Sequence, residues 1–356
     1  MIKCELSKGQ RSSNALIIGR HTVFSSFTGI KHNVDIGEMA QTKKYPPAQY
    51  DESELTVITT HTGDQRKVLR HDGLDLDVNF ISSGFTPDVR ENLKKMRVME
   101  CRDDDVFICA AMKAGTHWVW EITSMLLKGK AEYEHVAKET RMLEFHWPEE
   151  FDNLPSPRAL NTHFYLRHLP EQLQNGSKGR IIFIQRNPKD IAVSNFHHRK
   201  SMTVNPIKYS FSDFLRIYLE YGFTVDWFEY TKDWNKILKN NKNLQIHLMY
   251  YEDIIKDPIG ETRRLADFLK VSYDEQLIKD VSINCNFKNL KKANKEVKAA
   301  NTGNPNPNMD DFQNMYRKGE VGDWKNWFTV ADNEKFDAVM AERMEGLDFE
   351  YTYSLS

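Results

Sequence analysis

The segment VFICAAMKAGTHWVWEITSMLLK, residues 106–128, decides how the chain folds. It begins with the apolar run Val106–Ala111, which follows three aspartates and predicts a buried strand. A turn containing Gly115 comes next, and His117–Lys128 predicts a helix. The first turn of a helix carries unpaired N–H groups and a partial positive charge, both of which favour a bound phosphate or sulfate. The segment therefore predicts a strand, an anion-binding turn and a helix.

The turn AAMKAGTHW contains the residue types that an anion site needs. Gly115 lets the backbone approach a ligand closely, Lys113 supplies a charge and Thr116 supplies a hydroxyl donor. The turn does not satisfy the nucleotide pattern G-x-x-x-x-G-K-[ST], which disfavours a P-loop kinase. On these residues alone, an ordinary strand-to-helix turn with a surface lysine explains the sequence equally well.

Two further strands are predicted from the apolar runs Arg180–Gln185 and Leu244–Tyr251. Each is followed by a capping residue and a proline, Asn187-Pro188 and Asp257-Pro258, which predict helix starts. The first of these helices is expected over Lys189–Lys200. Strands that alternate with helices predict an α/β fold with a mostly parallel central sheet flanked by helices. Ligands of such sheets bind beyond the carboxyl ends of the strands, where these turns lie.

The composition predicts a globular protein without a strong overall charge. Hydrophobic residues make up 40% of the 356 residues, which is enough for a sizeable core. The 49 basic and 51 acidic residues nearly balance, so we expect neither nucleic acid nor an anionic membrane as a partner. Residues 1–60 predict a poorly ordered extension, followed by one folded domain over 61–356. The polar stretch Asn294–Asp311 predicts a mobile loop.

The cysteines and the N-terminal sequence indicate a cytoplasmic protein. Cys4, Cys101, Cys109 and Cys285 form no C-x-x-C pair and do not suggest a disulfide framework, so we expect a reducing compartment. No run approaches the roughly 18 apolar residues that span a bilayer. The beginning of the chain lacks the compact apolar core of a signal peptide.

Two more segments place cations beside groups that suit a phosphate. Arg186 ends a predicted strand, with Ser194 about two helical turns later, and an arginine at this position can bind a phosphate bidentately. Tyr316-Arg317-Lys318-Gly319 combines two cations and a glycine with an aromatic ring. Taken separately, Arg186 is more often a solvated ion-pair partner, and the run 316–319 is more often a solvated turn.

Taken together, six segments of the chain resemble the cytosolic PAPS-dependent sulfotransferases. They occur in family order over residues 70–350: MKAGTHW at 112–118, SPRALNTHFYLRHLP at 156–170, RNPKDIAVSNF at 186–196, YYEDIIKDP at 250–258, NFKNLKK at 286–292 and YRKGEVGDWKNWFTVADNEKF at 316–336. The resemblance implies an enzyme that transfers a sulfuryl group from the donor nucleotide PAPS to the hydroxyl or amine of a small apolar acceptor. The products are a sulfate ester or sulfamate and the nucleotide PAP.

The resemblance also implies a donor site assembled from distant segments. The 5′-phosphosulfate loop is matched by Lys113, Ala114, Gly115, Thr116, His117 and Trp118, with Trp118 stacking on the adenine. The adenine side is matched by Tyr251 and Phe287, and the neighbouring Asn286 joins the donor-binding set. The 3′-phosphate set is matched by Arg186, Ser194, Arg317, Lys318 and Gly319.

His163 matches the catalytic base of the family. It would remove the acceptor proton, a role that suits a side chain with a reference pKa of about 6.5. Lys113 would stabilise the negative charge that grows on the bridging oxygen. The family needs no metal, and no carboxylate or histidine cluster in this sequence demands one. Without the matched segment, a lone histidine on a predicted strand is ordinarily structural, and His168 and His197-His198 are interpreted as surface or supporting residues.

The chain departs from the family pattern at four positions. Met112, Ala114 and His117 stand where the family usually has Pro, Ser, and Thr or Ser, and Asn161 replaces a lysine found in many phenol-acting members. The backbone donors of the loop survive these changes. The altered loop motivates an alternative hypothesis, a PAP- or PAPS-binding protein of the same fold without transferase activity. The intact Lys113 and His163 argue against it.

Two further expectations follow from the resemblance. Lys325, Thr329, Val330 and Glu334 match the dimerisation motif K-x-x-x-T-V-x-x-x-E of the family, so we expect a homodimer with a small interface. Acceptor pockets of this kind are mostly apolar, and this one is expected to include Trp147, Phe151 and Phe164.

Overall fold

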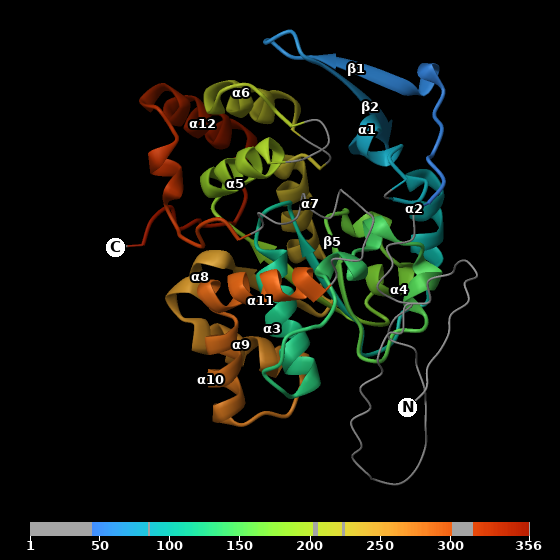
Figure 1. Ribbon diagram of the computed structural model, residues 1–356, viewed down its shortest axis with the longest axis vertical. Helices are drawn as coiled ribbons and strands as arrows, with labels where there is room; N and C mark the ends of the chain where they lie inside the picture. Colours follow the sequence, from blue (N-terminus) through green and yellow to red (C-terminus); the bar gives the residue numbers. More distant parts are fainter. Residues whose placement is uncertain (1–44, 85, 202–205, 223–224, 301–315, 356) are drawn as a thin grey trace, which may run out of the picture. The chain divides into compact units, whose positions relative to one another are not determined.

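The central feature of the computed structural model is a four-stranded parallel sheet with the order β5-β4-β6-β7 (Figure 1). The structure describes residues 45–84, 86–201, 206–222, 225–300 and 316–355, with the side chains of 297–300 left out. The strands are β4 (Val106–Ala110), β5 (Ala159–Thr162), β6 (Arg180–Gln185) and β7 (Ile246–Tyr250). The predicted fold class, a mostly parallel sheet flanked by helices, is confirmed.

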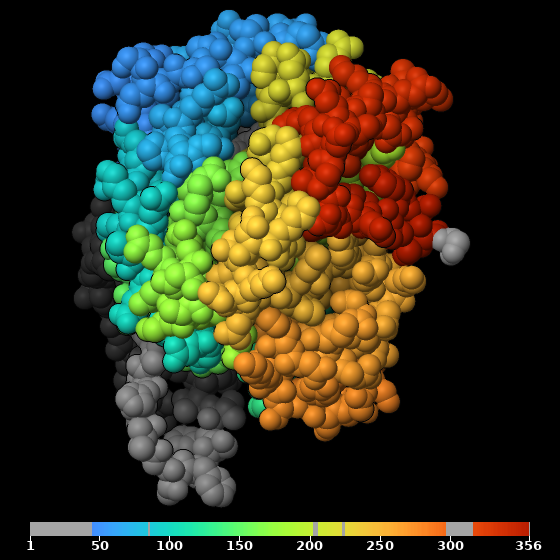
Figure 2. All heavy atoms as spheres, turned by 180° about the vertical axis from the view of Figure 1, so that it is seen from behind, coloured from blue at the N-terminus to red at the C-terminus, as the bar shows by residue number. Residues whose placement is uncertain are grey.

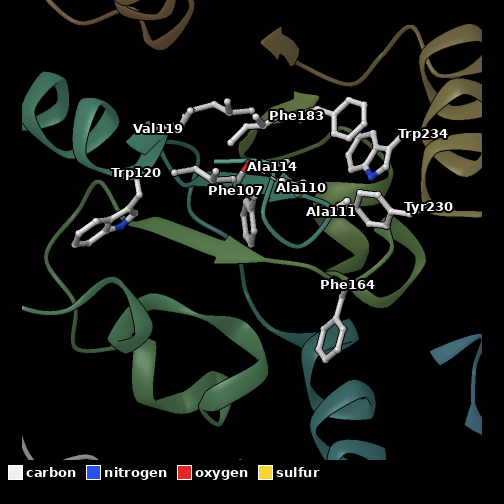
Figure 3. Close-up of a cluster of buried hydrophobic side chains, with 14 of the residues drawn as sticks. Phe107, Ala110, Ala111, Ala114, Val119, Trp120, Phe164, Phe183, Tyr230 and Trp234 are labelled. Atoms are coloured by element: carbon white, nitrogen blue, oxygen red, sulfur yellow. Dashed lines mark hydrogen bonds between the residues drawn. The ribbon is translucent and has the colours of Figure 1, made fainter. Parts of the chain in front are cut away.

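The inner strands are buried because their sequences are almost continuously apolar. All five residues of β4 are buried, as are five of the six in β6, a pattern typical of parallel strands covered on both faces. Phe183 of β6 stacks on Trp234 with ring centroids 4.3 Å apart, and Phe107 and Tyr230 belong to the same cluster (Figure 3). The core therefore fixes the ends of β4 and β6, where the predicted ligand site lies.

The long helices cover the sheet and begin where the capping residues predicted. Asn187 accepts hydrogen bonds from the backbone of Lys189 and Asp190, and Asp257 accepts one from Gly260, with proline at the first helical position in both cases. The helices of the parallel part are α3 (Thr116–Lys128), α4 (Glu171–Gln174), α5 (Pro188–Lys200), α6 (Phe211–Tyr221), α7 (Trp227–Asn240), α8 (Tyr251–Lys256), α9 (Pro258–Leu269), α10 (Glu275–Asn284), α11 (Phe287–Ala300) and α12 (Val330–Arg343).

The C-terminal helix α12 is held against α7. The guanidinium of Arg343 donates to Asp226 at 3.0 Å and to Glu229 at 3.2 Å, and it lies 4.1 Å from the centroid of the Phe228 ring. Figure 2 shows this C-terminal segment in red beside the gold surface of α7. The contact anchors the segment that follows the run 316–319.

A second, antiparallel sheet precedes the parallel one. It consists of β1 (Leu55–Thr59), β2 (Gln65–His71) and β3 (Leu74–Asp77), followed by α1 (Val78–Ile81) and α2 (Val89–Val98). The strand β1 lies inside the stretch 1–60 for which composition predicts poor order, because its pairing with β2 supplies hydrogen bonds that composition does not reveal. Residues 1–44 of that stretch lie outside the described residues.

The structure departs from the expected elements in two other places. β7 begins two residues later than the predicted strand, and α8 follows it directly without a loop. Residues 294–300 of the predicted loop Asn294–Asp311 continue α11, and 301–311 lie outside the described residues. Among the described residues, no helix has both the length and the apolar character needed to cross a bilayer.

Candidate active site

Two residues of the turn between β4 and α3 have a left-handed backbone conformation, which is unstrained for glycine and strained for lysine. Lys113 has a φ of +71° and Gly115 one of +115°. A Cβ atom on Gly115 would lie 2.8 Å from Cδ2 of Tyr251, so glycine also makes room for that ring. Burial, followed by the charges of Arg186 and Lys138, lowers the pKa of Lys113 to about 7. The turn thus holds a lysine that an anion would return to its charged form.

One cavity collects most of the residues that the sequence selects. Its lining includes both predicted catalytic residues, Lys113 and His163. It also includes eleven further residues of the predicted donor site: Gly115, Thr116, His117, Trp118, Arg186, Ser194, Tyr251, Phe287, Arg317, Lys318 and Gly319. Segments more than 200 positions apart in the sequence therefore face the same space. The strand order explains this arrangement, because the carboxyl ends of β4, β5, β6 and β7 meet at one edge of the sheet.

Two predicted donor-site residues do not line this cavity. Ala114 is 1% exposed, and its side chain belongs to the core cluster in Figure 3. The side chain of Asn286 accepts a hydrogen bond from the backbone of Asn289 at 2.9 Å and donates to the carbonyl of Ile283 at 2.7 Å. Asn286 therefore links the end of α10 to the start of α11 rather than facing the cavity.

Arg186 connects the end of β6 to the anion loop. Its Nη1 donates to the carbonyl oxygen of Lys113 at 3.0 Å, and its guanidinium lies 4.1 Å from the centroid of the Tyr251 ring. Tyr251 in turn meets Trp118 edge-on at 5.2 Å. A guanidinium held on an aromatic face loses little entropy when it binds a phosphate. The packing therefore pre-organises a cation between the loop and the aromatic wall.

The run 316–319 is organised by one carboxylate. The carboxylate of Asp323 forms ion pairs with Nζ of Lys318 at 2.5 Å and with Nη2 of Arg317 at 2.6 Å. Burial alone would raise the pKa of Asp323, but the hydrogen bonds from Lys318, Asn326 and Arg317 outweigh it and lower the pKa to about 2. Gly319 has a φ of +72°, and a Cβ atom there would lie 2.2 Å from Cδ2 of Phe287. The two cations and the Phe287 ring are therefore placed together.

His163 directly follows β5 and is fixed by its backbone as well as its ring. Its backbone N–H donates to Oε1 of Glu144, which also accepts from Thr162 Oγ1 at 2.9 Å and from the Phe164 backbone at 3.2 Å. Its ring Nδ1 donates to the carbonyl oxygen of Ala110 at 2.7 Å. Burial, followed by the charge of Lys138, lowers the pKa of His163 to about 3. The imidazole is therefore neutral near pH 7, and one of its ring nitrogens carries no proton.

Four charged or titratable residues in the cavity lining were missed by the sequence analysis: Lys138, Glu139, His198 and Glu320. Lys138 and Glu139 belong to the 3₁₀ helix η2 (Lys138–Arg141), and Oε1 of Glu139 lies 2.7 Å from Nε2 of His117. Burial, followed by the charge of Lys138, lowers the pKa of His117 to about 4. The segment around η2 carries no periodicity or motif, so only its packing beside β5 brings it to the site.

The interpretation of the remaining histidines is partly corrected. His198 faces the cavity, one turn beyond Ser194 on α5, because residues four apart share a helix face. His197 instead packs edge-on against Trp327 at 4.4 Å. His168 is fully buried, and its Nε2 lies 3.0 Å from the carbonyl oxygen of Asp72.

The three aromatic residues expected around the acceptor do not line this cavity. Phe151 and Phe164 are 1% and 2% exposed and belong to the core, and Trp147 carries the ammonium of Lys95 over its ring at 4.5 Å. The apolar part of the lining comes instead from Met112, Met142, Phe145, Leu290 and Tyr316. Aromatic composition alone did not distinguish a core face from a cavity face.

The matched dimerisation residues lie at the surface. Lys325, Thr329, Val330 and Glu334 are all exposed, and Val330 is exposed to 77%. The hydroxyl of Thr329 also caps α12 by accepting from the backbone of Asp332 at 3.1 Å. An exposed valine beside charged residues is available for a contact outside the chain.

Comparison with known proteins relates both the sequence and the fold to one family. The family model described as sulfotransferase domain matches residues 103–348. Mouse sulfotransferase 1A1 is 31% identical over 277 residues, which cover 73% of this chain and 91% of that protein. The match includes every segment that lines the cavity.

Two solved structures share the fold. Mouse sulfotransferase SULT7A1 complexed with PAP has a TM-score of 0.64 and 26% identity, with 79% of this chain and 96% of that one covered. Retinol dehydratase in complex with retinol and PAP has a TM-score of 0.60 and 19% identity, with 84% and 92% covered.

Proposed function

The chain belongs to the PAPS-dependent sulfotransferase family, and from this premise we propose that it transfers the sulfuryl group of PAPS to the hydroxyl or amine of a small acceptor with a largely apolar body. The observation that carries the proposal is that Lys113, His163 and the cations Arg186 and Arg317 line one cavity. A donor anion, a base for the acceptor and a leaving-group cation can therefore meet there. The apolar lining from Met112, Met142 and Phe145 suits an acceptor of this kind.

The donor would lie across the carboxyl ends of the strands. In this proposal its phosphosulfate binds the N-terminus of α3 and Lys113, and its adenine lies among Trp118, Tyr251 and Phe287. The 3′-phosphate binds the cluster Arg186, Ser194, Arg317, Lys318 and Gly319. The PAP bound in the related mouse SULT7A1 supports a nucleotide ligand for this chain. Gly115 and Gly319 let the rings of Tyr251 and Phe287, which would flank the adenine, lie close to the two loops.

The proposed reaction is an in-line transfer between two oxygen atoms or from oxygen to nitrogen. The bond from sulfur to the bridging phosphate oxygen breaks, the bond from sulfur to the acceptor atom forms, and the acceptor proton passes to Nε2 of His163. Lys113 stabilises the charge left on the bridging oxygen of PAP. Positioning and charge stabilisation supply most of the rate enhancement, as they do in phosphoryl transfer, and the proposal includes no metal.

Incubation with sulfur-labelled PAPS and a panel of phenols, alcohols and amines tests this function. Labelled sulfate ester or sulfamate, formed together with PAP in equal amounts, is the expected result. Tight PAP binding without transfer to any member of the panel would support the alternative, a nucleotide-binding protein without transferase activity.

We further propose a homodimer and a cytoplasmic location. The exposed Val330 and its charged neighbours Lys325 and Glu334 support the dimer, and the buried free thiols of Cys101, Cys109 and Cys285 are compatible with a reducing compartment. Sedimentation of Val330→Glu should show a monomer, whereas Val98→Glu, at a valine exposed to 76% on α2, should sediment like the parent chain. A parent chain that sediments as a monomer would contradict the dimer.

A further inference from the structure

Lys138 is a buried lysine in the lining of the cavity. It lies in η2, is 3% exposed and lines the same cavity as Lys113 and His163. The segment η2 to η3 (Leu143–Phe145) runs beside β5, where Met142 forms a bridge with Asn161, two residues before His163. The backbone of this segment therefore lies beside the end of β5, which His163 directly follows.

Lys138 lacks the close partner that a buried cation normally has. Among the described residues, no carboxylate lies within 4.0 Å of its Nζ and no hydrogen bond involves it. The two carboxylates whose charges act on Lys138 have other contacts: Glu139 pairs with His117, and Oε1 of Glu144 accepts from the turn that carries His163. Burial lowers the pKa of Lys138, and these two carboxylates only partly offset it. A buried ammonium group costs several kcal/mol unless something pairs with it, so a site that retains one is suited to an anion.

The charge of Lys138 acts on both proposed catalytic residues and on His117. It contributes to the lowered pKa of Lys113, of His117 and of His163, and for His163 it is the largest cause after burial. In the proposed reaction, the sulfuryl group lies between the leaving oxygen near Lys113 and the acceptor atom near His163. A cation whose charge acts on both Lys113 and His163 is therefore suited to contact the sulfuryl group that lies between them.

We infer that Lys138 is a second catalytic cation, whose ammonium group contacts the non-bridging oxygens of the sulfuryl group while it moves from PAPS to the acceptor. This inference rests on the proposed function. The bonds made and broken are those given above, and Lys138 keeps its proton throughout. It stabilises the negative charge of the oxygens in transit, and its charge keeps the resting imidazole of His163 neutral.

Single-turnover transfer by Lys138→Met, with PAPS saturating, tests the inference. Methionine keeps the length of the side chain and removes the charge. The transfer rate should fall about 10²-fold, which is typical for the loss of one group that stabilises transition-state charge. PAP lacks the sulfuryl group, so its dissociation constant should change by less than about twofold. Lys138→Arg should recover part of the rate, and Lys130→Met, at an exposed lysine just after α3, should behave like the parent chain.

The pH profile separates a catalytic from a structural role. The titratable groups around His163 are Lys138, His117 and Lys113, whose charges lower its pKa, and Glu144, whose Oε1 accepts from its backbone N–H. The charge of His163 acts in turn on His198. Removing the Lys138 charge raises the pKa of His163, so the acidic limb of kcat/KM should move to higher pH in Lys138→Met. Loss of stability alone would lower the amplitude of the profile without moving this limb. If Lys138→Met does not fold, Lys138→Gln takes its place with the same measurements.

Three results would overturn the inference: an unchanged transfer rate in Lys138→Met, a loss of PAP affinity as large as the loss of rate, or a defect confined to acceptors that carry an anionic group. The second result would make Lys138 a structural counter-ion of Glu139 and Glu144, and the third would make it an acceptor-binding residue. Each presupposes that the parent chain transfers sulfate. A parent chain without transfer would refute the proposed function instead, so the two failures are distinct.

Discussion

The Nδ1–H of His163 donates to the carbonyl oxygen of Ala110 at 2.7 Å, which joins the residue after β5 to the last residue of β4. A carbonyl oxygen only accepts hydrogen bonds, so this contact places the proton of the neutral ring on Nδ1 and leaves Nε2 as the proton acceptor. The strand that leads into the anion loop thereby also sets the tautomer of the proposed base.

Replacing His163 by alanine should remove transfer while leaving nucleotide binding intact. The imidazole acts on the acceptor, so the rate should fall by about 10²–10⁴-fold, the usual contribution of a general base. Labelled-sulfate transfer and PAP titration measure the two effects separately. His135→Ala, at an exposed histidine, is the matched control. Activity that survives in His163→Ala would remove it from this role.

Arg186→Ala should weaken PAP binding. It removes a charge-assisted phosphate contact of about 1.5–3 kcal/mol, which corresponds to roughly 10- to 150-fold in the dissociation constant. Arg180 begins the same strand, at the edge of the sheet opposite the cavity, so Arg180→Ala controls for the loss of an arginine from β6. Calorimetric titration with PAP compares the two variants. Equal affinities would exclude Arg186 from the phosphate site.

Gly319→Ala should lower PAP affinity through the ring of Phe287. The added Cβ would lie 2.2 Å from that ring, which must move, and we expect a loss of about tenfold, or ~1.4 kcal/mol. Gly129 has a similar positive φ of +65° but nothing within 4 Å of the added atom. Backbone strain should lower the stability of both variants by about 1–2 kcal/mol, which thermal unfolding measures. Gly129→Ala should nevertheless keep the parent affinity for PAP. A parent-like affinity in Gly319→Ala would contradict the assigned contact.

PAP binding should weaken as the pH rises above 7. The pKa of Lys113 is lowered to about 7 by burial first and by Arg186 next, so the free protein loses this cation between pH 6.5 and 9. The phosphates, with a second pKa of about 6, stay ionised over that range. The dissociation constant should therefore rise by up to about tenfold per pH unit. Lys113→Arg, whose guanidinium stays charged, should flatten the dependence of PAP affinity on pH. A flat profile in the parent chain would contradict the lowered pKa of Lys113 as its cause.

Local physical chemistry explains which elements were predictable. The strand β6 and the start of α5 follow from an apolar run, a capping asparagine and a proline, all of which act within a few residues of the chain. Where a distant partner decided the structure, prediction was weaker. β1 exists because β2 pairs with it, and α11 continues through residues with polar side chains because its apolar residues, such as Leu290 and Ala293, pack inward.

The site divides in the same way. Lys113, His163 and Arg186 stand out in the sequence because each belongs to a recognisable segment at a strand end, and the parallel order of the strands then brings those ends together. Phe151 and Phe164 show the opposite case, since an aromatic residue near such a segment packs as readily into the core as into a cavity.

The sequence by itself determined the family, the parallel α/β fold and the main anion-binding residues, because these depend on short segments whose order and spacing are visible in the chain. Only the tertiary structure decided that Lys138, Glu139 and His198 face the same cavity. Cavity lining depends on how η2 and α5 pack beside the sheet, which is a long-range property that no local periodicity encodes. The charge of Lys138 in this cavity, which acts on His163, is the consequence with the most direct bearing on the proposed catalysis.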